Sequence, residues 1–476
     1  MKGFSETMKQ ERAVAGSLLP AFYKVFGLIA LCLFLPRYAI AHQIVGWRSN
    51  GSGEYPDANP PTEWSTSKNV LWCTPMPGWS NSSPTHSKGF LFVCAEPSTL
   101  LCVQASDGKI LWQRSNDYRD MQTPEEAAKA NEALKSTEAA EQELRKQQEE
   151  LIQTKRDLRK TPDDKELTEK LASIKKKIDD LKKQMEPSAA YRLPPTHGEN
   201  GYSSCTPTTD GKFVYAMFGN GVVACYDFDG KRKWIKLAEK PTDGWGHSSS
   251  PLLIDHKLVV LVNSLIALNA ETGEVVWRAP AQHRYGTPLA AKVGETEVIV
   301  TPGGEIVRVS DGIVMAQGIS DLTYCAPAWN KDVVYFIQNG GKAIRLAPES
   351  GGRVRPDVLW QTSPVNDRYY ASPVVHDGLI YATNQAGDFS VIEGSSGNIL
   401  HHRKLNLGAT IYSSVTLAKN LLYISAENGA TVILEVGPDP KEIARNQLEK
   451  FRSSPVFIGN RMYIRSREKL YCIGGN

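Results

Sequence analysis

The chain has few cysteines, and none of them forms a short motif. Eight cysteines occur in 476 residues, with no C-x-x-C and no adjacent pair. This pattern excludes a disulfide framework and a structural zinc site. Most of these thiols are expected to be small buried strand residues. Cys94 and Cys102, four residues either side of Ser98 in an expected hairpin, could form a cross-strand disulfide.

The chain also lacks a large excess of either positive or negative charge. The 55 basic and 52 acidic residues give a net charge of +3, and residues 1–41 carry that excess. The remaining 50 basic and 50 acidic residues balance, so the body has no field that would steer it onto nucleic acid. We expect no nucleic-acid partner.

Long hydrophobic runs are absent apart from the N-terminal stretch 25–35, and its eleven residues are too few to span a bilayer. Small residues at Ala39 and Ala41 follow, as at a signal-peptidase site. We therefore predict a signal peptide over 1–41, cleaved after Ala41, and a bacterial protein exported to the periplasm or beyond the cell. After cleavage it would not be an integral membrane protein. An uncleaved anchor is the alternative.

Residues 123–187 contain no aromatic residue and no glycine, and 31 of these 65 positions are charged. Thr123-Pro124 and Thr161-Pro162 each read as a helix start. After the second start, apolar residues follow a 4-3-4-3-4 spacing that is typical of a coiled-coil seam: Leu167, Leu171, Ile174, Ile178, Leu181 and Met185. We predict one helix on each side of Thr161, folded as an antiparallel coiled-coil hairpin inserted over 119–190. It is either a solvated insertion or an arm that binds a partner.

The rest of the chain repeats. Small residues and a proline precede four short β-runs, separated by turns, every 37 to 46 residues after the first gap. The repeat positions are Pro84, Pro207, Pro251, Pro288, Pro327, Pro373, Val415 and Pro455. Four strands per unit of about 40–45 residues is the signature of a β-propeller blade. The last repeat lacks a fourth strand, and Val70–Trp72 would supply it. The fold class is therefore all-β, an eight-bladed propeller, with the propeller start at 42–118 and blades 2–8 within 191–476.

Tryptophan follows a glycine turn by four residues in several repeats, as at Gly273 and Trp277. Repetition at equivalent positions favours docking between blades over ligand stacking. The predicted docking residues are Trp72, Trp112, Trp234, Trp277 and Trp360.

The run 267–277 (ALNAETGEVVW) resembles the tryptophan-docking motif of pyrroloquinoline quinone (PQQ) propellers. The segments 46–53, 61–64 and 69–72 resemble exported PQQ-like propeller proteins of planctomycete-type bacteria. The likeness covers about 46–118 and 197–474, with the outer-membrane assembly propeller BamB as a distant relative. It implies an eight-bladed exported protein and does not by itself imply PQQ.

Aligned repeats place a distinct set of residues just before each first strand, which is the innermost strand of a blade. These residues would surround one mouth of the central channel and suit stacking or anion recognition. Alternatively, tyrosine and serine there satisfy backbone groups. The candidate ligand-binding residues are Trp79, Tyr202, Trp245, His247, Arg284, Tyr285, Tyr324, Arg368, Tyr370, Tyr412 and Arg452; Asn81, Ser204 and Ser248 complete the set of equivalent positions.

Motifs of known enzyme classes are missing: there is no P-loop, HExxH, EF-hand loop or GxSxG. We predict no catalytic residues, no metal site and no cofactor, and a monomeric, non-catalytic platform that binds envelope proteins or a small ligand. The main alternative is a PQQ-dependent dehydrogenase that uses Ca²⁺ and oxidises alcohols or sugars. Its nearest candidate carboxylates are Asp243 and Asp367, and the vicinal Cys-Cys of many such enzymes is absent. A glycan-binding or sugar-processing propeller is a third possibility.

Overall fold

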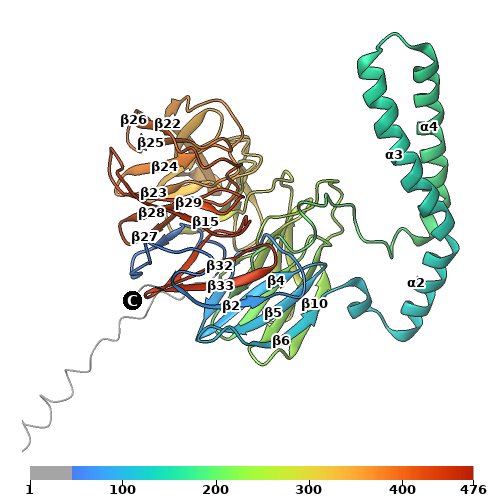
Figure 1. Ribbon diagram of the computed structural model, residues 1–476, viewed down its shortest axis with the longest axis horizontal. Helices are drawn as coiled ribbons and strands as arrows, with labels where there is room; N and C mark the ends of the chain where they lie inside the picture. The colour runs from blue at the N-terminus through green and yellow to red at the C-terminus, as the bar shows by residue number, and fades with distance from the viewer. Residues whose placement is uncertain (1–45, 475–476) are drawn as a thin grey trace, which may run out of the picture. The chain divides into compact units, whose positions relative to one another are not determined.

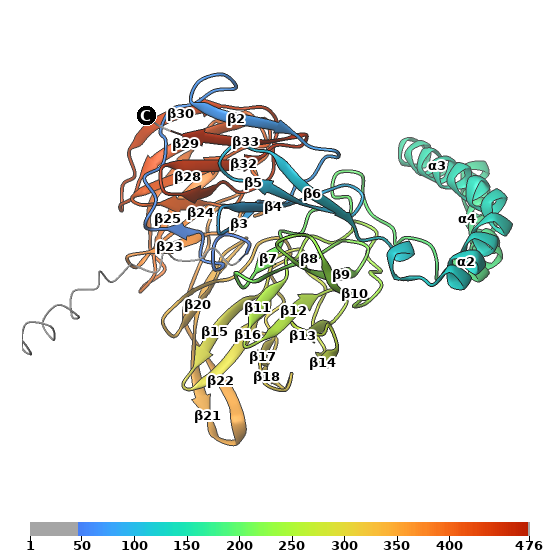
Figure 2. The same cartoon turned by 90° about the horizontal axis from the view of Figure 1, so that it is seen from below.

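The computed structural model describes residues 46–474. The predicted signal peptide and its cleavage site lie outside the described residues. Strands dominate, and eight sheets of four or five strands follow one another along the chain (Figure 1, Figure 2). Within each sheet the consecutive strands pair antiparallel, and only β1 and β2 join a sheet from elsewhere in the chain, so the eight predicted blades are confirmed.

The blades are numbered here by their order in the chain. Blade 1 contains β3 (Thr85–Ser87), β4 (Phe90–Ala95), β5 (Thr99–Gln104) and β6 (Ile110–Ser115); blade 2 contains β7 (Thr208–Thr209), β8 (Phe213–Met217), β9 (Val222–Asp227) and β10 (Arg232–Leu237). Blade 3 contains β11 (Leu252–Ile254), β12 (Lys257–Leu261), β13 (Leu265–Asn269) and β14 (Val275–Ala279); blade 4 contains β15 (Leu289–Val293), β16 (Thr296–Val300), β17 (Ile306–Arg308) and β18 (Val314–Ala316).

Blade 5 contains β19 (Ala328–Asn330), β20 (Val333–Phe336), β21 (Gly341–Glu349) and β22 (Arg353–Thr362); blade 6 contains β23 (Val374–His376), β24 (Leu379–Thr383), β25 (Asp388–Glu393) and β26 (Ile399–Lys404). Blade 7 contains β27 (Thr416–Ala418), β28 (Leu421–Ser425), β29 (Ala430–Glu435) and β30 (Glu442–Gln447), with β1 (Glu54–Tyr55) added in parallel to β27. Blade 8 contains β31 (Val456–Ile458), β32 (Arg461–Arg465) and β33 (Lys469–Gly474).

The fourth strand of blade 8 comes from the other end of the described chain. β2 (Val70–Pro75) pairs antiparallel with β33, and Val70 faces Ile473. This is the strand that the sequence predicted for this place. Pairing it here satisfies an edge of β33 that would otherwise be open to other chains.

Five of the eight blades dock onto the next blade through a tryptophan. The indole N–H of Trp234 in β10 donates to Ala270 O at 3.0 Å, and a Cβ on Gly273 would lie 2.6 Å from the same ring. Glycine is needed at that turn because the indole lies directly on the backbone, which also has a φ of +73°. Equivalent bonds to the next blade are made by Trp72, Trp112, Trp277 and Trp360.

The inserted segment holds three α-helices, of which α3 and α4 lie side by side (Figure 1, Figure 2). These are α2 (Pro124–Ser136), α3 (Glu138–Lys160) and α4 (Lys165–Gln184), flanked by short 3₁₀ turns at Tyr118–Met121 and Glu186–Ser188; a third 3₁₀ turn, Ser350–Gly352, joins β21 to β22. Ile174, Ile178 and Leu181 of the predicted seam are buried. Lys177 and Lys170 of α4 form ion pairs with Glu143 and Glu150 of α3.

Two details of the predicted hairpin differ. The sequence predicted one helix before Thr161, but the helix breaks at Thr137, which is buried and hydrogen-bonded to Ser188 and Arg192 of the returning chain. The second hairpin helix is capped by Asp164, whose side chain accepts from Leu167 N, and Thr161 ends α3 instead. Tertiary hydrogen bonds and a better capping carboxylate decided both points.

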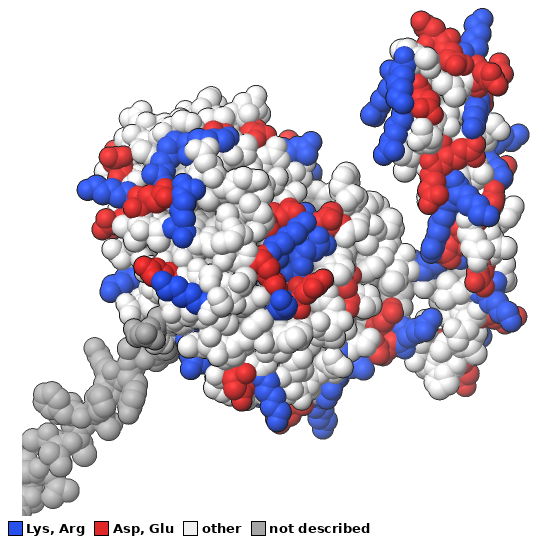
Figure 3. All heavy atoms as spheres, in the orientation of Figure 1, with Lys and Arg blue, Asp and Glu red and all other residues white. Residues whose placement is uncertain are grey.

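The seven cysteines among the described residues are all free. Cys94 faces Leu100 and Cys102 faces Phe92, because the turn of the hairpin is centred on Pro97 rather than Ser98. The two thiols are therefore out of register, and the considered disulfide is wrong. Among residues 46–474, no helix is both long and apolar enough to cross a bilayer. Basic and acidic side chains are interspersed on the face in Figure 3.

Candidate functional site

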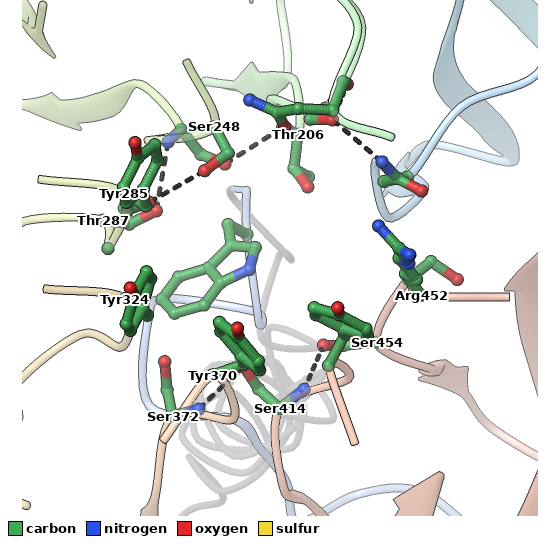
Figure 4. Close-up of a pocket in the computed structure, with 18 of the residues that line it drawn as sticks. Thr206, Ser248, Tyr285, Thr287, Tyr324, Tyr370, Ser372, Ser414, Arg452 and Ser454 are labelled. Atoms are coloured by element: carbon green, nitrogen blue, oxygen red, sulfur yellow. Dashed lines mark hydrogen bonds between the residues drawn. The ribbon is translucent and has the colours of Figure 1, made fainter. Parts of the chain in front are cut away.

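One cavity of about 390 Å³ collects the third residue before every repeat position, which is Val415 in blade 7 and a proline in the other seven blades. Figure 4 shows the labelled members of this lining surrounding it. The eight equivalent residues are Asn81, Ser204, Ser248, Tyr285, Tyr324, Tyr370, Tyr412 and Arg452, and all of them line it. Each lies just before the first strand of its blade, so the fold brings one side chain from every blade to the same mouth.

A second ring lies one residue before each repeat position, which is Val415 in blade 7 and a proline in the other blades. Proline keeps the preceding residue extended, and side chains two positions apart in an extended chain share a side. The residues one and three positions before the proline therefore both face the channel. This second ring consists of Ser83, Thr206, Ser250, Thr287, Ala326, Ser372, Ser414 and Ser454, and all except Ala326 line the cavity.

The hydroxyls of the second ring bind blade to blade. The backbone N–H of one ring member donates to the hydroxyl of the next at 2.9–3.1 Å. Seven such bonds run from blade to blade, including one from Ser454 of blade 8 to Ser83 of blade 1. Ala326 has no hydroxyl, so the eighth bond, from Thr287, is missing. The sequence analysis missed this ring, although hydroxyl residues at seven of eight equivalent positions are a readable signal.

Half of the mouth is a continuous arc of aromatic rings. Tyr285 and Tyr324 are stacked with centroids 5.7 Å apart, Tyr324 meets Tyr370 edge-on at 4.8 Å, and Tyr370 stacks on Tyr412 at 4.6 Å. The guanidinium carbon of Arg452 lies 4.1 Å from the Tyr412 centroid and ends the arc. Neighbouring blades bring the rings together, and offset or edge-on packing holds each in place.

Arg452 is neutralised by two carboxylates. Its Nη2 lies 2.8 Å from both Glu199 and Glu427, and Lys450 also pairs with Glu427. Burial opposes ionisation of Glu427, but hydrogen bonds from Lys450 and Arg452 prevail and hold its pKa below the usual range. Glu199 also accepts from Arg467 at 3.0 Å. This side of the mouth is a fixed ionic network.

Arg368, in contrast, has no ion pair among residues 46–474. Its Nη1 donates to the hydroxyl of Tyr370 at 3.3 Å, and that bond raises the pKa of Arg368. The neighbouring Asp367 accepts instead from the Arg368 backbone N–H and from Gln385 Nε2. Arg368 is thus a cation on the cavity wall without a carboxylate of its own.

The other half of the mouth is covered by residues 197–201, the chain that returns from the helical insertion; we call this segment the lid. His197, Glu199 and Asn200 line the cavity. Asn81 Nδ2 donates to Glu199 O at 2.9 Å, and Asn200 Nδ2 donates to Trp245 O at 3.0 Å. The lid was not predicted, because it follows the helical insertion at 119–190, which carries no repeat.

The floor of the cavity includes Trp47, from the N-terminal segment before β1. Its neighbour Arg48 is buried and donates through Nη2 to Pro373 O and Val415 O, both at 2.8 Å, in blades 6 and 7. Burial lowers the pKa of Arg48 to about 10. A Cβ on Gly46 would lie 2.8 Å from Thr208 of blade 2. The segment therefore reaches blades on several sides of the channel.

Seven of the eleven predicted site residues line the cavity: Trp245, Tyr285, Tyr324, Arg368, Tyr370, Tyr412 and Arg452. The other four lie behind or beside it. His247 is fully buried next to Cys205, and burial lowers its pKa to about 4. Arg284 pairs with Asp321. Trp79 lies under the guanidinium of Arg467, and the hydroxyl of Tyr202 donates to Pro194 O.

The donor set around the mouth does not suit a Ca²⁺-bound quinone. Glu199 is the only carboxylate among the residues that line the cavity, and two arginines already neutralise it. Asp243 accepts hydrogen bonds from the Tyr285 hydroxyl and the Trp245 backbone N–H. No group of three or more His, Cys, Asp or Glu residues within 46–474 could hold a metal ion. Ca²⁺ prefers six to eight oxygen ligands, so these residues do not fit it.

Comparison with known proteins agrees with this architecture. Residues 196–474, more than half of the chain, match the family described as outer membrane protein assembly factor BamB. The chain belongs to that family. The resemblance to BamB-like PQQ propellers is thereby confirmed. The match begins at the lid and spans blades 2–8, so α2–α4 and blade 1 lie outside it.

Individual relatives are distant. BamB of Yersinia pestis is 25% identical over 238 residues, 43% of this chain and 57% of the relative, so the chain spans little more than half of that protein. The crystal structure of BamB from Moraxella catarrhalis has a TM-score of 0.51 at 11% identity, covering 85% of this chain and 99% of that one. The designed protein Ika8 has the same TM-score at 9% identity, covering 86% and 100%. These two structures show the fold.

Proposed function

We propose that this chain is an exported, non-catalytic platform of the bacterial envelope, with the channel mouth and the helical hairpin as its binding surfaces. One observation carries the proposal. The cavity has an aromatic wall and an unpaired cation, while its one lining carboxylate is neutralised. Such a site can hold a ligand by stacking and by one charge, while its lining carboxylate is already paired with two arginines.

Membership of the BamB family supports a role in the envelope. A relative is named as an outer membrane protein assembly factor, and that name describes a protein which acts on other proteins. We extend this to binding of envelope proteins or of a small ligand by a monomeric propeller in the periplasm. The balanced charges outside 1–41 support the view that nucleic acid is not a partner.

The helical hairpin is the second candidate surface. Its helices lie outside the family match, and Ile152 of α3 has an exposed side chain (52%) on an otherwise charged surface. Arg192, which follows the hairpin, pairs with Glu141 and donates to Thr137. Hydrogen bonds and an ion pair therefore connect the base of the hairpin to the segment that leads into the lid. A partner that binds the helices would thus bind a part of the chain only a few residues from the lid.

A photocrosslinking experiment tests the platform. A photoreactive residue replaces Tyr324 in the full chain, and the control replaces Leu237, which is exposed on β10 and does not line the cavity. Irradiation of intact cells should give a discrete crosslinked envelope partner or ligand from position 324 only. Identical products from both positions, or none from position 324, would contradict a binding role of the mouth.

The PQQ-dependent dehydrogenase is tested separately. Purified full chain is mixed with PQQ and Ca²⁺, followed by absorbance of bound quinone and by dye reduction with alcohols and aldoses. We expect no saturable binding and no turnover, because the mouth lacks free carboxylate ligands. Saturable binding with turnover would overturn the platform reading in favour of an enzyme.

A further inference from the structure

Trp245 is an exposed tryptophan whose backbone and ring both contact neighbouring residues. Its side chain is 61% exposed, and it lies at the edge of the cavity. Its backbone N–H donates to Asp243 Oδ1 at 2.7 Å, and its carbonyl accepts from Asn200 at 3.0 Å. The ring of His197 stacks on the indole with centroids 4.4 Å apart. A large, exposed and preorganised aromatic side chain is typical of an anchor for a partner.

Glycine allows this display. Gly246 has a φ of +90°, and a Cβ there would lie 2.2 Å from Thr196 Oγ1 and 2.8 Å from Asn200 Nδ2. The backbone after Trp245 is therefore pressed against the start of the lid. Contacts with the lid therefore set the orientation of Trp245, and the two would move together.

Among the described residues, Arg368 of the mouth has no salt bridge and the Oδ1 atom of Asn81 has no hydrogen bond. Arg368 has no carboxylate, although its Nη1 touches the hydroxyl of Tyr370. Asn81 Oδ1 is buried without a hydrogen bond, while its Nδ2 is used by the lid and by Ser204. The mouth therefore lacks one anion for Arg368 and one N–H or O–H donor for Asn81.

The channel already holds a stretch of polypeptide. Trp47 lines the cavity, and Arg48 donates to the carbonyls that directly precede the innermost strands of blades 6 and 7. Gly53 O and Tyr55 O then accept from Leu417 and Lys419 of blade 7. The same inner surface thus binds chain by backbone hydrogen bonds and an aromatic side chain.

We propose that the mouth binds a short segment of a partner protein in which a carboxylate lies next to an aromatic side chain. The aromatic side chain packs between Trp245 and the tyrosine arc, the carboxylate pairs with Arg368, and a backbone N–H of the segment donates to Asn81 Oδ1. The proposal rests on the platform function and names the chemistry of its ligand. The carboxylate is either an acidic side chain of a loop tip or the end of a chain.

Fluorescein-labelled peptides test this directly with the full-length mature protein. The reference is acetyl-Gly-Ser-Phe-Asp-Ser-Gly-amide, compared with versions carrying Asn for Asp or Ala for Phe. A fourth peptide ends in Phe with a free carboxylate and has no acidic side chain. Anisotropy titrations should show that either acidic source binds about threefold to fivefold more tightly than the Asn or Ala peptides, the ratio that an ion pair with the exposed Arg368 side chain supports.

Variants locate the contacts. Arg368→Gln should remove the preference for Asp over Asn, while Trp245→Ala should remove the preference for Phe over Ala. The matched controls are Arg355→Gln, an exposed arginine paired with Asp357, and Leu237→Ala, both of residues outside the cavity lining. These controls should leave all affinities within about twofold of wild type, as expected for independent sites.

Equal affinities for the Asp and Asn peptides, with no binding of the free-carboxylate peptide, would overturn the inference. So would an unchanged Asp preference in Arg368→Gln. Binding of a uronic acid disaccharide without any peptide binding would also overturn it, in favour of a glycan. The crosslinking experiment at position 324 tests the platform function independently, because it does not depend on which peptide binds.

Discussion

The backbone N–H of Ser454 in blade 8 donates to the hydroxyl of Ser83 in blade 1 at 2.9 Å. This bond joins the last repeat to the first at the cavity wall. It belongs to the series of seven equivalent bonds that stops only at Ala326. The residues that bind blades together thus alternate with those that form the mouth, along the same short extended segments.

Ala326→Ser should complete the series. We expect the new hydroxyl to accept from the Thr287 N–H and to raise the free energy of unfolding by about 0.5–1.5 kcal/mol, the usual net value of a hydrogen bond. Urea unfolding followed by tryptophan fluorescence measures the change. Ala328→Ser on β19 is the control and should give no gain. A loss of stability in Ala326→Ser would mean that the hydroxyl is buried without a partner.

The reverse change should be costly. Ser372→Ala removes the hydroxyl that accepts from the Ala326 N–H at 2.9 Å and leaves that donor buried. We expect a loss of about 1–3 kcal/mol, the penalty of an unsatisfied buried donor. The same urea titration measures it, and a change within about 0.5 kcal/mol would show that the series contributes little.

Gly273→Ala tests how blades dock on tryptophan. The new Cβ would lie 2.6 Å from the Trp234 ring and also forces alanine into a φ of +73°. Gly318→Ala is a matched control, because Gly318 has a φ of +72° and no atom within 4 Å of the added Cβ. We expect a loss of about 1–2 kcal/mol for the control from backbone strain. Gly273→Ala should lose about 1–3 kcal/mol more from overpacking. Equal losses of stability in Gly273→Ala and Gly318→Ala would show that contact with the Trp234 ring does not require glycine at position 273.

Stability should fall in weak acid because of His247. Burial lowers the pKa of His247 to about 4 in the folded protein, whereas an unfolded histidine has a pKa of about 6.5. Between these values only the unfolded chain binds the proton, so the free energy of unfolding falls by up to about 3 kcal/mol as pH drops from 6.5 to 4. His86 contributes in the same direction, since burial lowers its pKa to about 4.

Thermal unfolding at several pH values checks this. His247→Gln should be less stable near neutral pH but should show a flatter dependence between pH 6.5 and 4, because the proton-binding group is gone. His256→Gln, an exposed histidine, is the control and should keep the wild-type slope. An unchanged slope in His247→Gln would contradict the buried neutral imidazole.

The ionic network should hold the lid in place. Glu199→Gln removes the charge that pairs with Arg452 and Arg467. Amide exchange at Asn200 and Gly201, whose N–H groups donate to His197 O, should become several-fold faster, as for a local opening that costs less. Glu295→Gln, an exposed residue paired with Lys292, is the control. Unchanged exchange would mean that the backbone contacts of the lid suffice without this charge.

Much of the mouth could be predicted because the repeats carry it. The four tyrosines recur at one offset from the repeat proline, so aligning the repeats aligns the site. His247 and Arg284 were predicted beside them but point elsewhere, because each is one residue from a channel-facing position in an extended segment and so lies on its opposite side. Residue types alone did not show which of two adjacent residues faces the channel.

The amino-acid sequence by itself determined the number of blades, the strand that completes blade 8, the presence of a helical insertion and the aromatic half of the mouth. All of these are local or periodic, since they depend on strand alternation, turn residues and helix spacing. Only the tertiary structure decided that Trp47 forms the floor, that residues 197–201 cover half of the opening, and that Arg452 is neutralised while Arg368 is not. Those relationships join segments far apart in the chain, and packing and charge pairing between such segments leave no periodic mark in the sequence.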